Sequence, residues 1–304
     1  MKSDVFYWLL NLSLHGGLVC LLVLALRRIR AIPRRVLFCL WLAPLVRLTV
    51  PFALSLPVSF MGLLRMLGSR TVIIPGPETD STHSSLYMSN TLQAADDYFP
   101  IIYKTDALRS LFETCALIWA IVAAACVLTL AVLYAMSRSE ARGGRALRKG
   151  VWESEKVVSP GLVGIIQPRI LVPVGTQGRL LDFIVAHETA HRRRLDNLWR
   201  ILALLVCCVH WFNPVVWWSL KRFFEDMELA CDEAVLRGMK PNERKDYARA
   251  LLSVAKGRDL FVSAFGGAKL RVRVERVLSY KKLTLGSALV FAALAATVIV
   301  VLAT

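Results

Sequence analysis

Long apolar stretches constrain the fold of this chain more than any other feature. A helix needs about 20 apolar residues to cross the hydrocarbon core of a bilayer. Four stretches are long enough: residues 5–26, 36 to about 60, 111–136 and 283–303. Hydrophobic residues make up 56% of the 304 residues, and the mean hydropathy is +0.53, whereas a soluble domain is about 45–50% apolar. We therefore predict a mainly α-helical, polytopic membrane protein with about four transmembrane helices.

A cleaved signal peptide is the alternative reading of the first stretch. Its apolar run is longer than the usual hydrophobic region of a signal peptide. Three arginines follow it where a small-residue cleavage site would stand: Arg27, Arg28 and Arg30. We expect this segment to remain as a membrane helix.

Basic residues set the predicted orientation, because the loops that carry them stay in the cytoplasm. One cluster lies between the first two stretches, and a second follows the third: Arg27, Arg28, Arg30, Arg34 and Arg35, then Arg138, Arg142, Arg145, Arg148 and Lys149. The sequence therefore predicts a multi-pass protein of the cell membrane with its N-terminus outside. Residues 1–136 would form three membrane helices with an outer loop at 62–110. Residues 137–282 would be cytoplasmic, and 283–304 would be the last membrane helix.

A further apolar segment, residues 198–220, has basic residues on both sides, which places both of its ends in the cytoplasm. Pro214 divides it into two arms that are each too short to cross. We predict a helical hairpin that either dips into the inner leaflet or lies buried in the cytoplasmic domain. A true fifth crossing is the competing interpretation, and it would separate the two candidate halves of the site described next.

The candidate site begins with the run His187-Glu188-Thr189-Ala190-His191. No proline or glycine interrupts residues 180–203, so the run is expected to be helical. Residues four apart share a helix face, so both imidazoles can bind one metal ion while Glu188 approaches a water molecule. Three protein ligands around Zn²⁺ leave a position for water, which makes a nucleophile near neutral pH. The pattern predicts a zinc-dependent metalloendopeptidase with Glu188 as its catalytic base.

A second acidic helical segment supplies the candidate third ligand. Glu228 and Asp232 are four residues apart, so Glu228 can bind the metal while Asp232 accepts a hydrogen bond from a ligand histidine. Asp196 is expected either to orient the active helix or to pair with Arg192 or Arg200. A solvated acidic face is the plainer reading of the segment. Cys231 lies beside Glu228, but this ligand set needs no thiol, and we expect Cys231 not to bind the metal.

Short β-branched stretches before the active helix predict a small sheet, which makes the cytoplasmic domain α+β. They are residues 156–158, 162–166 and 169–172, with turn residues between them. An edge strand beside a zinc site can pair with an extended substrate. Core packing explains the strands equally well.

The net charge of +16 does not indicate nucleic-acid binding, because much of it lies in the two juxtamembrane clusters, which anionic membrane lipids attract. We expect no direct contact with nucleic acid. None of the seven cysteines falls in the predicted outer loop. A disulfide framework is therefore not indicated.

Several motifs, taken in order along nearly the whole chain, resemble one family. The chain is similar to membrane zinc metallopeptidases of the beta-lactam sensor-transducer and antirepressor type. The motifs are Arg47-Leu48-Thr49-Val50-Pro51, the segment from Ser159-Pro160-Gly161 to Pro173, His187 to His191 followed by Asp196, Trp211-Phe212-Asn213-Pro214, and Glu228-Leu229-Ala230-Cys231-Asp232.

The resemblance implies a gluzincin-like cytoplasmic domain with zinc on His187, His191 and Glu228, supported by Asp232. It also implies proteolysis of a cytoplasmic protein such as a transcriptional repressor, or self-cleavage. Residues 261–267 form an apolar, glycine-containing segment of the kind that a protease can bind as an extended strand. We expect self-cleavage near Ala264 and Phe265. Residues 1–304 contain no Ser-x-x-Lys combined with Lys-Thr-Gly, so we do not expect beta-lactam sensing from them alone.

Two other functional classes remain open at this point. A quality-control or prenyl-type membrane protease would share the zinc motif. A non-catalytic membrane sensor or transporter would keep the motif only for structure. The presence of Glu188 argues against the second class, because a structural zinc site fills its fourth position and needs no base.

Overall fold

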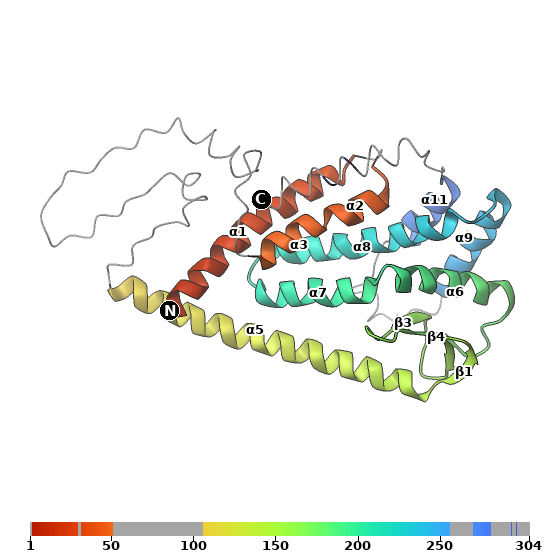
Figure 1. Cartoon of the computed structure of the whole chain (residues 1–304), viewed down its shortest axis with the longest axis horizontal. Helices are drawn as coiled ribbons and strands as arrows, with labels where there is room; N and C mark the ends of the chain where they lie inside the picture. Colours follow the sequence, from red (N-terminus) through yellow and green to blue (C-terminus); the bar gives the residue numbers. More distant parts are fainter. Residues whose placement is uncertain are drawn as a thin grey trace, which may run out of the picture.

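The computed structural model describes residues 2–29, 32–50, 106–255 and 270–280, together with residues 293 and 296. Almost all of the predicted last membrane helix and of the predicted outer loop, and the expected cleavage residues Ala264 and Phe265, lie outside the described residues. The described part is mostly helical, with one small sheet, as the sequence predicts. Figure 1 shows α5 (Asp106–Glu140) running along the molecule, with the sheet at its C-terminal end.

Two helices are long and apolar enough to cross a membrane: Trp8–Leu26 within α1 (Lys2–Leu26), and Ser110–Ser139 within α5. Only 11% of the α5 stretch is buried inside the protein. Leu117, Ile121 and Leu128 are among its exposed apolar side chains. A soluble protein rarely exposes so continuous an apolar surface. The two helices match the first and third predicted spans.

The described part of the second predicted span is broken. It forms α2 (Arg34–Leu40) and α3 (Leu42–Thr49), with a turn at Trp41. Pro44 explains the break, because its ring lacks an N–H and meets the carbonyl four residues earlier, which belongs to Leu40. Helix α3 packs against α1, and the two helices approach closely where Leu48 lies over Gly16. A Cβ atom at position 16 would lie 2.3 Å from the Leu48 side chain, so any larger residue there would collide with Leu48.

The sheet has four strands in the order β1-β2-β4-β3. Their bounds are β1 Arg145–Arg148, β2 Val151–Ser154, β3 Gly161–Val163 and β4 Arg169–Pro173. The central pair β2 and β4 is parallel, and both edge strands are antiparallel to their neighbours. The predictions at 162–166 and 169–172 correspond to β3 and β4, although β3 ends at Val163. The predicted strand at 156–158 is wrong, because the chain turns there between β2 and β3.

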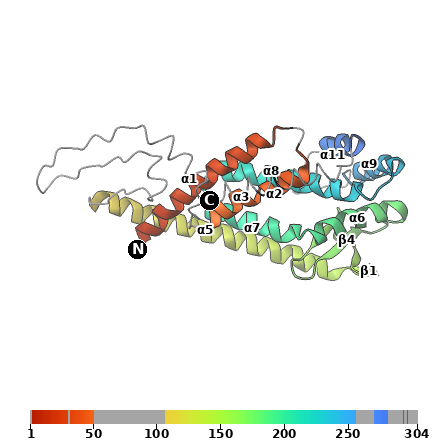
Figure 2. The ribbon, with the colours of Figure 1, turned by 45° about the horizontal axis from the view of Figure 1, so that its top comes forward.

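The remaining helices form the centre of the molecule and the end that carries the sheet. They are α6 (Gly178–Arg193), α7 (Asp196–Val209), α8 (Pro214–Leu236), α9 (Pro241–Ala255) and α11 (Leu270–Leu278). Figure 2 shows α9 and α11 at the same end as α6. Helix α8 is the long central element, and it contacts α1, α2, α6, α7 and α11.

The predicted hairpin is formed by α7 and the first half of α8, joined at residues 210–213 (Figure 1). Its tip lies among the apolar helices, not in the sheet-bearing end of the molecule. The Trp119 indole on α5 donates to the Val209 carbonyl at 2.7 Å, and His210 Nε2 donates to the Leu48 carbonyl at 3.0 Å. Because the chain returns along α8, Glu228 comes back beside His187. A single crossing would have separated them.

Asn213 fixes this tip through both ends of its amide. Its oxygen caps α8 by accepting from the Val215 N–H at 2.9 Å. Its nitrogen donates to the Ser13 carbonyl at 3.0 Å and to the Ser13 hydroxyl at 2.8 Å. One residue therefore stabilises the start of α8 and attaches it to α1.

We expect Asn213→Ala to destabilise the folded protein by about 2 kcal/mol, combining a lost N-cap with a lost net hydrogen bond. Unfolding followed in detergent measures the change. Asn242→Ala is the control, because Asn242 is exposed in the first turn of α9. Equal stabilities of the two variants would show that the Asn213 amide does not hold the hairpin tip.

Candidate metal centre

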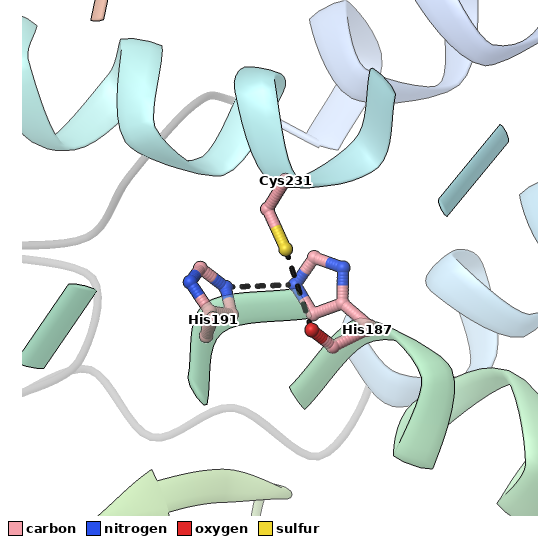
Figure 3. Close-up of side chains that lie close together, drawn as sticks. All are labelled: His187, His191 and Cys231. Carbon is pink, nitrogen blue, oxygen red and sulfur yellow. Dashed lines mark hydrogen bonds between the residues drawn. The ribbon is translucent and has the colours of Figure 1, made fainter. Parts of the chain in front are cut away.

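The two predicted imidazoles lie one turn apart on α6 and point at the same place. His187 Nε2 and His191 Nε2 are 3.1 Å apart, and both side chains are buried. Figure 3 shows the rings facing each other beneath α8. The expected helix and the shared face of the two histidines are both present.

Glu228 comes from α8 to complete this arrangement. Its carboxylate oxygens lie 3.6 Å from His187 Nε2 and 3.7 Å from His191 Nε2. The structure therefore brings together the three side chains that the sequence predicted as ligands, although 36 residues lie between His191 and Glu228. Burial opposes ionisation of this carboxyl, but His191, His187 and Arg273 outweigh burial and hold the pKa of Glu228 well below its usual range.

These separations fit a tetrahedral zinc ion. Two ligand atoms that each lie about 2.0–2.1 Å from tetrahedral zinc are about 3.3–3.4 Å apart. The distance of 3.1 Å between the two Nε2 atoms, and the distances of 3.6 and 3.7 Å from these nitrogens to the two different Glu228 oxygens, lie on either side of that value. Two neutral imidazoles and one carboxylate also form a donor set typical of catalytic zinc.

Asp196 fixes the orientation of His191. Its carboxylate oxygen accepts from His191 Nδ1 at 2.6 Å, which leaves Nε2 free as the ligand atom. Asp196 reaches back because Leu195 has a left-handed backbone with φ of 57°, a conformation that turns the chain sharply between α6 and α7. Asp196 lies 3.5 Å from Arg194, not against Arg192 or Arg200. Of the two roles weighed for Asp196, orientation of the active helix is the one that the contacts favour.

Asp232 supports His187 together with a residue that the sequence did not indicate, Tyr247 on α9. The Tyr247 hydroxyl donates to Asp232 at 2.7 Å and accepts from His187 Nδ1 at 2.9 Å, while Asp232 itself lies 3.3 Å from that nitrogen. Burial and the Asp232 charge raise the pKa of the Tyr247 phenol, so it stays protonated and can donate. The predicted role of Asp232 is therefore shared with a hydroxyl.

Two arginines join the carboxylates of the centre. Arg200 on α7 donates to Glu228 at 2.6 Å. Arg273 on α11 makes two hydrogen bonds of 2.8 Å to Asp232 and lies 3.5 Å from Glu228. Burial opposes ionisation of Asp232, but Arg273 outweighs it and lowers the pKa of that carboxyl.

Sequence reasoning missed Arg273, although one signal was available. Leu270, Val274 and Val277 follow the spacing of an apolar helix face, and Arg273 stands on that same face. An arginine on the buried side of a short helix needs an anionic partner. That pattern predicts a buried acid, but it does not say which one.

Cys231 also reaches the centre, which the sequence-based expectation did not foresee. His187, His191 and Cys231 form a group whose ligand atoms all lie within 4.8 Å of one another (Figure 3). The Cys231 thiol donates to the His187 backbone carbonyl at 3.3 Å. Its position brings a sulfur atom within reach of the same space that Glu228 faces.

Glu188 lies beside the ligands with only 8% of its surface exposed. In the part of the chain that the structure describes, its carboxylate makes no hydrogen bond or ion pair. The other carboxylates of the centre all accept hydrogen bonds from side chains: Asp196 from His191, Glu228 from Arg200, and Asp232 from Arg273. Glu188 is thus the acid of this group whose carboxylate has no partner among the described residues.

The edge strand β3 contacts α6, and one carbonyl of the strand and one just beyond its end accept hydrogen bonds from a side chain of α7. The Asn197 amide donates to the Leu162 carbonyl at 2.8 Å and to the Gly164 carbonyl at 3.0 Å. Asn197 follows Asp196, so the contact ties the sheet edge to the start of α7. Pairing of β3 with a substrate, which stays a prediction, requires this amide to move.

Comparison with known proteins identifies the family to which this chain is similar. A family model described as BlaR1 peptidase M56 matches residues 7–275. Among curated proteins, the regulatory protein BlaR1 of Bacillus licheniformis is 32% identical over 102 residues, which is 33% of this chain and 17% of that protein. The methicillin resistance mecR1 protein of Staphylococcus aureus is 26% identical over 103 residues, which is 33% of this chain and 18% of that protein. The matched part thus spans less than a fifth of each relative.

We expect Tyr247→Phe to weaken zinc binding by about tenfold, the lower end of the range for residues that orient metal ligands. The hydroxyl that holds His187 Nδ1 and Asp232 is lost, while the ring stays in place. Competition with a chromogenic chelator measures the affinity. Tyr280→Phe is the control, since the Tyr280 ring stacks on Arg244 and its hydroxyl bonds no described residue. An unchanged zinc affinity in Tyr247→Phe would show that the Tyr247 hydroxyl does not orient the ligand His187.

Proposed function

Because the chain belongs to the BlaR1 peptidase M56 family, we propose that it is an integral membrane zinc metalloendopeptidase that acts in transmembrane signalling. Its substrate would be a cytoplasmic regulator of the repressor type, its own chain, or both. The matched curated relatives are named as a regulatory protein and a resistance protein, which supports a regulatory role.

The observation that carries the proposal is the meeting of Glu228 with the two imidazoles. The two Nε2 atoms are 3.1 Å apart, and each lies 3.6 or 3.7 Å from one of the two Glu228 oxygens. Each histidine has its second nitrogen bound to an acceptor, so Nε2 presents a lone pair inward. A structural zinc site would fill a fourth position with protein and would not place an unbound carboxylate beside it.

The residues divide the work as follows. A zinc ion on His187, His191 and Glu228 would supply an activated water molecule and polarise a peptide carbonyl. Glu188 would accept the proton of the attacking water and pass it to the departing amine, as a general base and then a general acid. Asp196, Asp232 and Tyr247 would hold the imidazoles in the required tautomer. Arg200 would fix the Glu228 carboxylate.

The membrane location supports a substrate on the cytoplasmic side. Helices α1 and α5 would cross the bilayer, and the hairpin tip would re-enter it among them. The arginine-rich ends of these helices would place the metal centre at the inner face, by the positive-inside rule. A cytoplasmic substrate is then the one that can reach Glu188.

A quality-control or prenyl-type membrane protease is the second enzyme function that this centre would serve. It differs from the favoured function in the range of proteins cut, since the zinc chemistry is the same. Sequence relatives named as regulatory proteins favour a narrow range.

Glu188→Ala tests the proposed activity. We expect hydrolysis of an unstructured fluorogenic peptide to fall by at least about 100-fold, because general acid-base groups typically contribute that much. Zinc content should stay at the wild-type level, since Glu188 is not a ligand. Asp182→Asn is the control, because it removes an exposed carboxylate from the same helix. If both variants hydrolysed the peptide at the wild-type rate, Glu188 would be excluded as the catalytic base.

The same purified proteins test self-cleavage by intact mass spectrometry. A cut near Ala264 and Phe265 should appear in the wild-type protein and in Asp182→Asn, and should be absent from Glu188→Ala. A fragment of identical mass in all three would come from another protease and would end the self-cleavage proposal.

Quantitative proteomics of cells that express the wild-type or the Glu188→Ala protein separates signalling from quality control. One regulator that is cut only with wild-type protein, and only under an inducing condition, is the expected result. Many cleaved membrane proteins under all conditions would instead support quality control.

A further inference from the structure

A buried carboxylate on α8 binds the region where the first membrane helix ends. Asp226 is 0% exposed. It accepts from Arg27 Nε at 2.9 Å, from an Arg34 guanidinium nitrogen at 2.8 Å and from the Trp41 indole at 3.0 Å. We call Arg27, Arg34, Arg35 and Trp41 the corner residues. Arg27 directly follows α1, Arg34 and Arg35 begin α2, and Trp41 directly follows α2.

The two other acids on this side of α8 extend the contact. Glu225 accepts from Arg27 at 2.6 Å. Glu233 accepts from the backbone N–H groups of Arg34 and Arg35 at 3.1 and 3.3 Å. The sequence assigned these arginines to lipid head groups. In the structure, the side chains of three of them, Arg27, Arg34 and Arg35, contact carboxylates of α8.

The corner residues and the metal centre lie on opposite sides of the same helix. At about 100° per residue, Glu228 is about 200° from Asp226, whereas Glu233 returns to within about 20° of it. Helix α8 thus presents Asp226 and Glu233 to the corner residues and Glu228 and Asp232 to the histidines. Only one residue, Met227, separates Asp226 from Glu228 along the chain.

This arrangement resists separation of the corner from α8. An unpaired buried carboxylate carries a large desolvation penalty, and here three donors offset it. A movement of the corner away from α8 would leave Asp226 and Arg34 buried without partners. The corner therefore moves together with α8, and α8 carries Glu228.

We propose that Asp226 is a positioning residue that couples the cytoplasmic end of the membrane helices to the metal ligand Glu228. The inference rests on the proposed zinc site for its consequence, but not for the coupling itself. A shift of α1 relative to α5, of the kind that a signal across the membrane would produce, reaches Glu228 through the corner residues and Asp226.

The test is Asp226→Asn in the full-length protein, compared with wild type and with Asp246→Asn. The control removes one negative charge from an ion-paired aspartate whose side chain is 35% exposed on α9. We expect zinc to pass to a chelator about tenfold faster from Asp226→Asn, as for other residues that orient ligands. Amide hydrogen exchange should also increase in residues 227–233, and neither change should appear in Asp246→Asn.

A purely structural role would lower the unfolding temperature of Asp226→Asn but leave both zinc release and exchange at 227–233 as in wild type. That result overturns the inference. If Asp226→Asn does not fold, Arg27→Gln decides, because it leaves Arg34 and Trp41 on Asp226. Faster release and exchange in Arg27→Gln support the coupling, and wild-type values refute it.

The two proposals fail in different ways. The zinc site would be refuted if the wild-type protein bound no zinc and the His187→Ala variant had the same zinc content. Hydrogen exchange at 227–233 would still decide the coupling, since it does not depend on metal.

Discussion

Buried carboxylates on α8 determine how the parts of this molecule meet. Asp226, Glu228 and Asp232 are all buried, and a buried charge requires a partner. Their partners come from several other elements: the corner residues at the end of α1 and on α2, the histidines of α6, Arg200 of α7, Tyr247 of α9 and Arg273 of α11. Apolar packing alone would allow these helices to slide, whereas ion pairs with fixed geometry allow few positions.

The sequence predicted which residues meet at this centre because their relation is partly local. His187 and His191, and likewise Glu228 and Asp232, are four residues apart on helices, and this spacing fixes a shared face before any tertiary contact forms. Their supporting residues are distant in sequence. Tyr247 lies 60 residues after His187, and Arg273 lies 41 residues after Asp232. Local periodicity tells which face of a helix is buried, but not which element covers it.

The errors in the fold have the same origin. Residues 156–158 have strand-forming side chains, yet β2 forms earlier, at 151–154, where Val151 packs against Ile170 and Ile184. Tertiary packing outweighed the local preference. In the second predicted span, hydropathy suggested one helix, but Pro44 and the fit of Gly16 against Leu48 produce two short ones.

The hairpin shows why apolar length by itself does not define a membrane crossing. Its segment is apolar enough to cross, but Asn213 turns the chain and bonds to Ser13 on α1 at the tip. The return arm then continues as the helix that carries Asp226 and Glu228. One uninterrupted helix therefore contacts the apolar bundle at its beginning and the metal centre near its end, and a helix bends far less readily than a loop. A displacement among the membrane helices consequently has a short and stiff route to the site of peptide cleavage that we propose.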